Sequence, residues 1–315
     1  MARARGFEAQ MALKTEVTYG EAPAGDYTKL PFITADLGAE QPLGEAPEIG
    51  VGRDPQEPWR DVITVAGQVE VPVDLRNFGN WLRLLLGPPV TDEGSSGLFL
   101  HTFTSGIVGL PSVSIEIGHP AVPAFLMNKG IRANTMSLNF QRSGAAQATM
   151  ELIGQAEARA TTSQAGTPTE AVFTRFNQFQ GSLKKDSVAI ANITSATLVY
   201  NNNLETIPVI RSDGVIENVE ETLSACTGTL DVRFADTVLL ALAESGGAME
   251  LEFAYIIDGD RQLIWTLHEV RIPKPKQQVS GPGGVSASFD FHSSTDPVLK
   301  RMATVELYND VSSYV

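Results

Sequence analysis

The chain has 315 residues, of which 43% are hydrophobic and 19% charged, as in a folded globular protein with room for two ordinary domains. Its formal charge of -14 argues against a surface that binds nucleic acid by neutralising phosphates. A single cysteine, Cys226, excludes an internal disulfide and a zinc site built from several cysteines.

The first half of the chain predicts a mainly β domain preceded by an arm. Residues 1–30 mix glycine, proline and charge, which predicts an arm with one short helical turn. A strand at 32–37 leads into an acidic loop at 38–60, and so long a loop inside a compact domain is usually functional or mobile. Further strands are predicted at 98–104, 112–117, 131–141 and 146–153.

Residues 65–87 form a unit in which a strand runs directly into a helix. The first part alternates valines with mostly polar residues, the period of a half-buried strand. The apolar residues then change to helical spacing; Asp74 or Asn77 can cap the start, and Gly87 ends the helix. Trp81 lies on the apolar stripe, which predicts a core residue rather than a ligand platform.

The same unit recurs 161 positions later. Residues 67–71 correspond to 228–232, and the second helix is expected at 237–246 after a gap of two residues. Upstream, the shift of 161 places 34–37 on 195–198. We interpret the shared order of these matches as an internal duplication of about one domain in length.

The duplication divides the chain into two tandem domains. Downstream of the unit, a shift of 139 places residues 148–152 on 287–291. We therefore predict a first domain at 1–157, a linker at 158–170 that is poor in apolar bulk, and a second domain at 171–315.

The second domain repeats the element order of the first. A loop at 201–219 is the counterpart of 38–60, a Gly-Pro-Gly-Gly run at 281–284 predicts a turn, and residues 296–315 predict a C-terminal arm that begins with a helical turn. Each domain is expected to be a mainly antiparallel β-sandwich or barrel with one short flanking helix. The strands are predicted at 189–200, 249–257, 262–270 and 285–292.

Motifs that would indicate an enzyme do not occur in the sequence. It has no phosphate-binding loop, nucleophile elbow or dinucleotide fingerprint, and its four histidines are scattered singly, so neither a metal nor a cofactor is predicted. Cys226 is expected to be a small apolar core residue. No run of eighteen apolar residues and no apolar signal region occur, so we expect a protein made in the cytoplasm without a membrane segment.

Four stretches of the first half together resemble the tail tube (major tail) proteins of long-tailed, non-contractile bacteriophages. They are the unit at 65–87 and the runs at 53–58 (RDPQEP), 101–106 (HTFTSG) and 114–120 (SIEIGHP). The resemblance covers about residues 15–155 directly and the second half through the duplication. No single stretch encodes a chemistry, but their order is characteristic.

The resemblance implies a structural virion protein whose rings stack into the hollow tube that delivers DNA to the host. If each domain supplies one sixth of a ring, three chains close it, so we expect a trimer with pseudo-sixfold symmetry. The expected partners are further copies of the chain and the terminator, tape measure and distal tail proteins. DNA would pass through the lumen without specific binding, and assembly would take place in the host cytoplasm.

This resemblance also implies two kinds of functional residue. The polar face of the unit strands would line the channel, where carboxylates repel phosphates and let DNA slide. These candidates are Gln68, Glu70, Thr229, Asp231 and Arg233, of which Arg233 is expected to pair with an acid. The acidic loops are as often merely solvated, but their presence at the same place in both halves favours a contact between rings. The candidates there are Glu40, Glu45, Glu48, Asp54, Glu57, Glu205, Asp213 and Glu217.

Two alternatives remain open from the sequence. A tail-terminator or distal-tail adaptor protein would form a single ring and would not polymerise. A β-sandwich that binds carbohydrate or mediates adhesion would need a groove lined by exposed aromatic residues, whereas Trp59, Trp81 and Trp265 lie far apart in the sequence.

Overall fold

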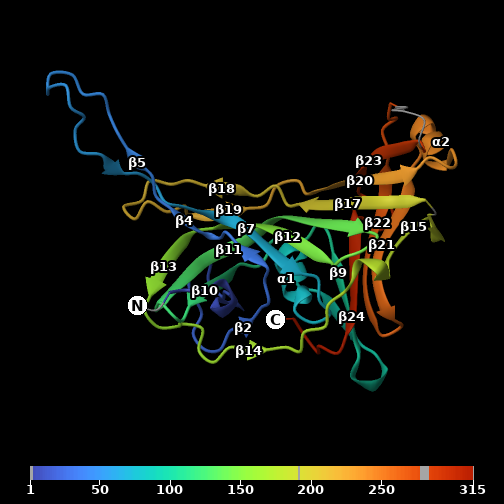
Figure 1. Cartoon of the computed structure of the whole chain (residues 1–315), viewed down its shortest axis with the longest axis horizontal. Helices are drawn as coiled ribbons and strands as arrows, with labels where there is room; N and C mark the ends of the chain where they lie inside the picture. The colour runs from blue at the N-terminus through green and yellow to red at the C-terminus, as the bar shows by residue number, and fades with distance from the viewer. Residues whose placement is uncertain (1–2, 191, 277–283, 315) are drawn as a thin grey trace.

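The computed structural model describes residues 3–190, 192–276 and 284–314, and this part of the chain is mainly β with two short α-helices (Figure 1). The first half contains β1 (Gln10–Thr15), β2 (Thr28–Lys29), β3 (Thr34–Ala35), β4 (Gly38–Glu40), β5 (Leu43–Gly44), β6 (Trp59–Arg60), β7 (Thr64–Pro72), α1 (Phe78–Leu86), β8 (Val90–Glu93), β9 (Phe99–Thr104), β10 (Val113–His119), β11 (Ala124–Gln141), β12 (Gln147–Gly154) and β13 (Ala156–Ala160).

The second half contains β14 (Thr169–Glu170), β15 (Gly181–Lys185), β16 (Val188–Ala189), β17 (Ile193–Asn201), β18 (Glu205–Ile207), β19 (Asn218–Glu220), β20 (Ala225–Arg233), α2 (Val238–Ser245), β21 (Met249–Asp258), β22 (Arg261–Arg271), β23 (Ser286–Ser294) and β24 (Ala303–Asn309). The turn predicted at 281–284 lies almost entirely outside the described residues.

One antiparallel run of strands crosses from the first half into the second. It has the order β7, β12, β11, β17, β20 and β23, and β3 and β4 extend it beyond β7. We call it the central sheet. Strand β11 has 18 residues, so its first part can pair with β10 and β13 while its last part pairs with β12 and β17. The two halves are therefore joined by backbone hydrogen bonds as well as by the connecting chain.

A second connection between the halves is made by β24. It lies between β22 of the second half and β9 of the first, and Val305 and Leu307 are fully buried there. Helix α1 packs against β11 and β9, and its buried residues include Trp81. The strands thus form one large mixed sheet around a shared apolar core.

The two halves share their strand register. Adding 161 to a residue number in β7 and 139 to the number of its partner in β12 gives two residues that face each other in β20 and β23. This holds for every residue pair between β7 and β12. For example, Glu70 lies opposite Thr149, and Asp231 lies opposite Ser288. The same sequence shifts that align the residues therefore align the hydrogen-bonded strands.

A tight backbone approach also recurs at the same place in both halves. A Cβ atom on Gly67 would lie 1.8 Å from the carbonyl oxygen of Asp36, and one on Gly228 would lie 2.0 Å from that of Thr197. Both glycines and both carbonyls are related by the shift of 161. Glycine is required because any side chain there would displace the neighbouring strand.

The structure corrects the predicted terminal arms. Residues 6–8 form a short 3-10 turn, as expected, but β1 follows it, pairs with β10 and buries Met11 completely. β24 is likewise a core strand within the predicted arm at 296–315. Both predictions were wrong because β1 pairs with β10 about one hundred residues away and β24 pairs with β9 about two hundred residues away, so local composition does not reveal the pairing.

Two predicted segments differ in detail. Of the strand expected at 32–37, only β3 is formed, and β4 lies at the start of the loop expected at 38–60; both strands pair with β7. Residues 158–170, predicted as a linker, are packed against the first half: β13 pairs with β11, and Ser163 and Gln164 donate hydrogen bonds to the Glu116 carboxylate at 2.6 Å each.

The predicted helices and core residues are confirmed. α1 and α2 agree with the expected ranges to within one or two residues, and Trp81 is buried. Cys226 on β20 is also buried, which raises the pKa of its thiol to about 12 and leaves it uncharged and inert.

Candidate channel face and its supporting contacts

One face of the central sheet is buried and the other is polar. On β7, the valines at 65, 69 and 71 are buried, whereas Gln68 is exposed and Glu70 is partly exposed. The other strands of the sheet alternate in the same way. The carboxylates on the polar face are those of Asp36, Glu40, Glu70, Glu151, Asp231 and Asp290.

The residues predicted for the channel in the first half lie together on this face. The Gln68 side-chain amide donates a hydrogen bond to the Glu151 carboxylate across the β7–β12 pair at 3.0 Å. The Thr34 hydroxyl lies 3.5 Å from the Glu70 carboxylate. Cross-strand contacts of this kind fix the side chains against the sheet.

The second half repeats this arrangement. The Ser195 hydroxyl donates to the Asp231 carboxylate at 2.8 Å, the counterpart of the Thr34–Glu70 contact under the shift of 161. The Thr229 and Thr197 hydroxyls are also 2.8 Å apart. The carboxylates of Glu70 and Asp231 are thus each contacted by a hydroxyl group from the strand paired beside them, β3 in the first half and β17 in the second.

Arg233 differs from the expectation. It lies on the polar face at the end of β20 and is exposed, but none of the ion pairs found within 3–190, 192–276 and 284–314 involves it. The expected pairing with an acid is thus not seen among the described residues, and Arg233 lies at the edge of an otherwise acidic surface.

The first acidic loop is a projecting hairpin. β5 and β6 pair at its base, and Figure 1 shows the segment extending well beyond the body of the protein. Glu45, Glu48, Asp54 and Glu57 are all exposed on it. Glu40 is exposed too, but it belongs to β4 and pairs with Thr64 in the central sheet, so it lies at the base of the projection.

The counterpart loop at 201–219 is also a hairpin, formed by β18 and β19, but it lies against the first half. The Gly214 carbonyl accepts a hydrogen bond from the Ile63 backbone at 2.9 Å, and the Gln155 side chain donates to the carbonyls of residues 216 and 217. Glu205, Asp213 and Glu217 are exposed on it, and Asp213 is paired with Arg211 at 2.7 Å.

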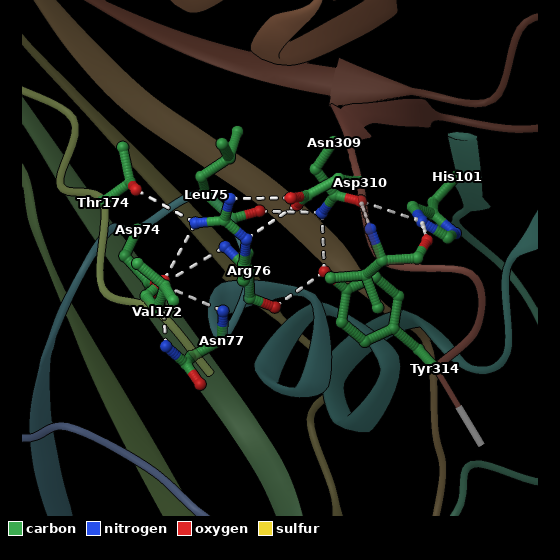
Figure 2. Close-up of polar contacts among 11 residues, drawn as sticks. Asp74, Leu75, Arg76, Asn77, His101, Val172, Thr174, Asn309, Asp310 and Tyr314 are labelled. Carbon is green, nitrogen blue, oxygen red and sulfur yellow. Dashed lines mark hydrogen bonds and ion pairs between the residues drawn. The ribbon is translucent and has the colours of Figure 1, made fainter. Parts of the chain in front are cut away.

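A polar cluster at the start of α1 holds the C-terminal segment in place (Figure 2). Arg76 Nε and Nη2 donate to the two carboxylate oxygens of Asp310 at 2.6 and 2.7 Å. Arg76 Nη1 donates to the Val172 carbonyl at 2.9 Å and the Thr174 hydroxyl at 3.0 Å. Arg76 therefore joins three segments that are remote in sequence. We call this group the Arg76 cluster.

Tyr314 and Asn309 complete the Arg76 cluster. The Tyr314 hydroxyl donates to the Arg76 carbonyl at 2.7 Å, and the Asn309 side-chain amide donates to the Leu75 carbonyl at 2.7 Å. Tyr314 packs against Gly79 so closely that a Cβ there would lie 2.1 Å from the ring. Asp74, whose pKa is raised by burial, accepts the backbone N–H of Arg76 at 3.2 Å and caps the turn before α1.

His101 connects the Arg76 cluster to β9. Its Nε2 lies 2.8 Å from the Val311 carbonyl, which can only accept, so Nε2 carries the proton. The Thr91 hydroxyl lies 2.8 Å from Nδ1 and donates to it in the neutral ring. Burial lowers the pKa of His101 below 6.5, because the charged ring would be poorly solvated.

A metal site requires several grouped ligand side chains, and a membrane-spanning helix requires a long apolar stretch. Among the described residues, no three histidine, cysteine or acidic side chains are grouped to hold a metal ion. In the same part of the chain, no helix is long and apolar enough to cross a membrane. What the fold presents instead is a wide polar sheet face, a projecting hairpin and open strand edges, all of which suit self-assembly.

The chain belongs to the phage tail tube protein family, whose model matches residues 6–293. It is therefore a structural, non-enzymatic component of the virion tail, and tail tube proteins assemble with themselves and with other tail proteins. No curated protein matches the chain. The family match spans both halves and includes the channel candidates of each.

Sequence reasoning missed the Arg76 cluster. Arg76, Asn309, Asp310 and Tyr314 stand in no motif, and the hydrogen bonds that tie the C-terminal segment to the start of α1 span more than 230 residues. The one available signal was Asp74 before the helix, which predicted a cap but not the C-terminal segment that packs beside it.

Proposed function

We propose that three copies of this chain form a ring with pseudo-sixfold symmetry, and that such rings stack into the tube of a long, non-contractile phage tail. The observation that carries this proposal is the shared register of the two halves, which a tandem duplication explains directly. Each half then supplies one sixth of the ring, in domains at 1–157 and 171–315. The ring needs three chains because each contributes two such units.

The polar face of the central sheet would line the channel. Gln68, Glu70, Thr229 and Asp231 occupy matching places in the two halves, so six nearly equivalent sets would face a pseudo-sixfold lumen. Fixed carboxylates and hydroxyl groups repel or only weakly bind phosphates, which favours passage of DNA over retention. The positive charge of Arg233 is the exception in this surface.

The projecting hairpin would connect successive rings. Its exposed side chains, among them Ile49 and the carboxylates of Glu45, Glu48, Asp54 and Glu57, are accessible to a neighbouring ring. The hairpin at 201–219 carries Glu205, Asp213 and Glu217 and would contribute to the same contact from its position against the first half of the same chain. Terminator, tape measure and distal tail proteins would meet the two ends of the tube.

Electron microscopy and native mass spectrometry of the purified protein test this proposal together. We expect tubes or stacked rings, and a released ring with three times the chain mass of 33.8 kDa. A ring of six chains would overturn the pseudo-sixfold trimer. Single rings that never stack would instead identify a terminator or adaptor protein.

A further inference from the structure

The duplication extends upstream of the central sheet, to the start of each half. A shift of 139 carries the first part of β11 onto β22, and a shift of 136 carries β10 onto β21, with a register irregularity recurring before Ile115 and Leu251. Against these strands, β1 and β15 match at a shift of 172, because Leu13 lies opposite Ile115 and Lys185 lies opposite Leu251. β1 and β15 are therefore equivalent strands.

The same shift of 172 relates the turns that precede these two strands. It carries the 3-10 turn Gly6–Glu8 onto the 3-10 turn Gln178–Gln180. The residue before each turn has an extended backbone, with φ of -125° in the first half and -116° in the second. Phe7 and its counterpart Phe179 are both largely exposed. The two turns are therefore equivalent as well.

Residues 175–177 precede the second of these turns and fill a gap in the first half. The backbone N–H of Phe176 donates to the Val73 carbonyl at 3.0 Å, and the Phe176 carbonyl accepts from the Ala146 N–H at 3.1 Å. Phe176 and Val73 are both completely buried. The segment thus closes the space between the end of β7 and the start of β12.

The equivalent place in the second half has the same backbone frame without such a segment. Val73 donates its N–H to the Ala146 carbonyl at 3.0 Å, and the shifts of 161 and 139 convert this contact into the 3.0 Å hydrogen bond from Phe234 to Val285. Within 3–190, 192–276 and 284–314, no hydrogen bond reaches the Phe234 carbonyl or the Val285 N–H. These two groups are the counterparts of the pair that Phe176 satisfies, and backbone polar groups need such partners when they are covered.

A groove of about 400 Å³ lies at this place, beside α2. Its lining includes the buried side chains of Val232 on β20 and Phe289 on β23. Residues 234–236 are exposed or partly exposed, whereas their counterparts at 73–75 are buried. The groove is therefore the second-half counterpart of the gap that Phe176 fills.

The counterpart of residues 175–177 is at the far end of the same chain from this groove. The shift of 172 assigns that role to residues 3–5, which are exposed. Figure 1 shows the start of the described chain, beside the label N, and α2 near opposite ends of the long axis. A neighbouring copy arranged head to tail brings its own residues 3–5 to the groove, as 175–177 meet the first half. This placement rests on the proposed ring, which orders the copies in that way.

We propose that the groove beside α2 receives residues 3–5 of a second copy of this chain, with Ala4 donating its N–H to the Phe234 carbonyl and accepting from the Val285 N–H. The large and small members of the pair are exchanged between the halves. Phe176 lies beside Val73 in the first half, and Ala4 lies beside Phe234 in the second. The larger residue at 234 thereby takes up space that Phe176 fills in the first half.

Backbone hydrogen bonds, rather than net charge, set the register of the inserted residues. The groove is lined by equal numbers of basic and acidic side chains, which are Lys185, Arg233, Asp186 and Asp236. Its charges therefore do not select for or against a basic segment such as Arg3-Ala4-Arg5 as a whole.

Disulfide trapping tests this register. Asp74 lies opposite Arg175 in an antiparallel bridge, and the shifts of 161 and 172 convert this pair into Ala235 opposite Arg3. Ala235 and Arg3 are exposed in the single subunit, and the only native cysteine, Cys226, is buried. Oxidation of assembled Arg3→Cys/Ala235→Cys protein should give a non-reducing gel ladder that ends at the covalent ring, a trimer under the proposed function.

Arg3→Cys/Asp92→Cys is the matched control for this trapping. Asp92 is exposed on β8 and is not among the residues that line the groove. The control should stay monomeric on the gel. Equal ladders from both variants, or no ladder from Arg3→Cys/Ala235→Cys in assembled rings, would overturn the proposal.

Removing one backbone donor tests the same contact without new cysteines. Ala4→Pro lacks the N–H that bonds to the Phe234 carbonyl, so it should raise the concentration needed for ring assembly several-fold. Ala4→Ser keeps that N–H and should assemble like wild type. Neither variant should change the Tm of the single subunit, because Ala4 is exposed and makes no hydrogen bond within the described chain.

The outcomes separate the inserted residues from the ring itself. Equal assembly of Ala4→Pro and Ala4→Ser would overturn the docking at the groove while leaving the ring intact. Absence of rings from the wild-type protein would overturn the proposed function, and the docking with it.

Discussion

The guanidinium of Arg76 holds the carboxylate of Asp310 through two hydrogen bonds, although the residues are 234 positions apart. This two-point contact ties the C-terminal segment to the start of α1. Its geometry matters because a planar guanidinium can satisfy both carboxylate oxygens at once, which a lysine cannot do. Arg76 thereby lowers the pKa of Asp310 below its ordinary value.

Replacing the members of this pair should have unequal effects. Asp310→Asn should lower the free energy of unfolding by about 1 kcal/mol, since the carboxylate is half exposed and screened by water. Arg76→Ala should cost about 2 kcal/mol because it also leaves the Val172 carbonyl and Thr174 without their donor. Urea unfolding measures both, with Arg211→Ala as an exposed-pair control of little effect. Equal and negligible losses in the free energy of unfolding for all three variants would show that Arg76 does not hold the C-terminal segment in place.

His101 should make stability depend on pH. Its pKa is lowered in the folded protein, so the unfolded chain takes up the proton first as the pH falls. The free energy of unfolding therefore falls as the pH drops below about 6.5, the pKa of the unfolded chain, and stops falling once the pH is below the lower pKa of the folded state. Between pH 7.5 and 5.5, the Tm of wild type should fall more than that of His101→Gln. The exposed His292→Gln should behave like wild type.

Gly228→Ala should destabilise the second half of the central sheet. Its new methyl group would lie 2.0 Å from the Thr197 carbonyl oxygen, so β17 and β20 must move apart. We expect a loss of about 1–3 kcal/mol in thermal or urea unfolding. Gly259→Ala, where a Cβ meets nothing within 4 Å, is the matched control and should be nearly neutral. If both variants lost similar stability, the loss would come from replacing a glycine in general and not from the close contact with the Thr197 carbonyl.

Shortening the projecting hairpin should separate ring formation from stacking. Gly44 and Trp59 are paired, so residues 45–58 can be replaced by Asn-Gly, which forms a tight two-residue turn between paired strands. The variant should fold with an unchanged Tm and form rings, but electron microscopy should show no tubes. Tubes of wild-type length from this variant would show that the hairpin does not connect rings.

The sequence alone predicted the elements with strong local periodicity. Alternating residues in β7 predicted a half-buried strand because successive side chains reach opposite faces, and the stripe around Trp81 predicted α1. The match of residues 67–71 with 228–232 predicted the equivalence that the strand register displays. The polar face with Glu70 and Asp231 followed from the same alternation.

Only the tertiary structure decided which distant segments pair. β1 and β24 have little local signal, yet they are core strands because β10 and β9, respectively, supply partners far along the chain. The Arg76 cluster likewise depends on chain topology. Strand pairing and ion pairing are contacts between remote residues, whereas periodicity reports only what each segment can bury by itself.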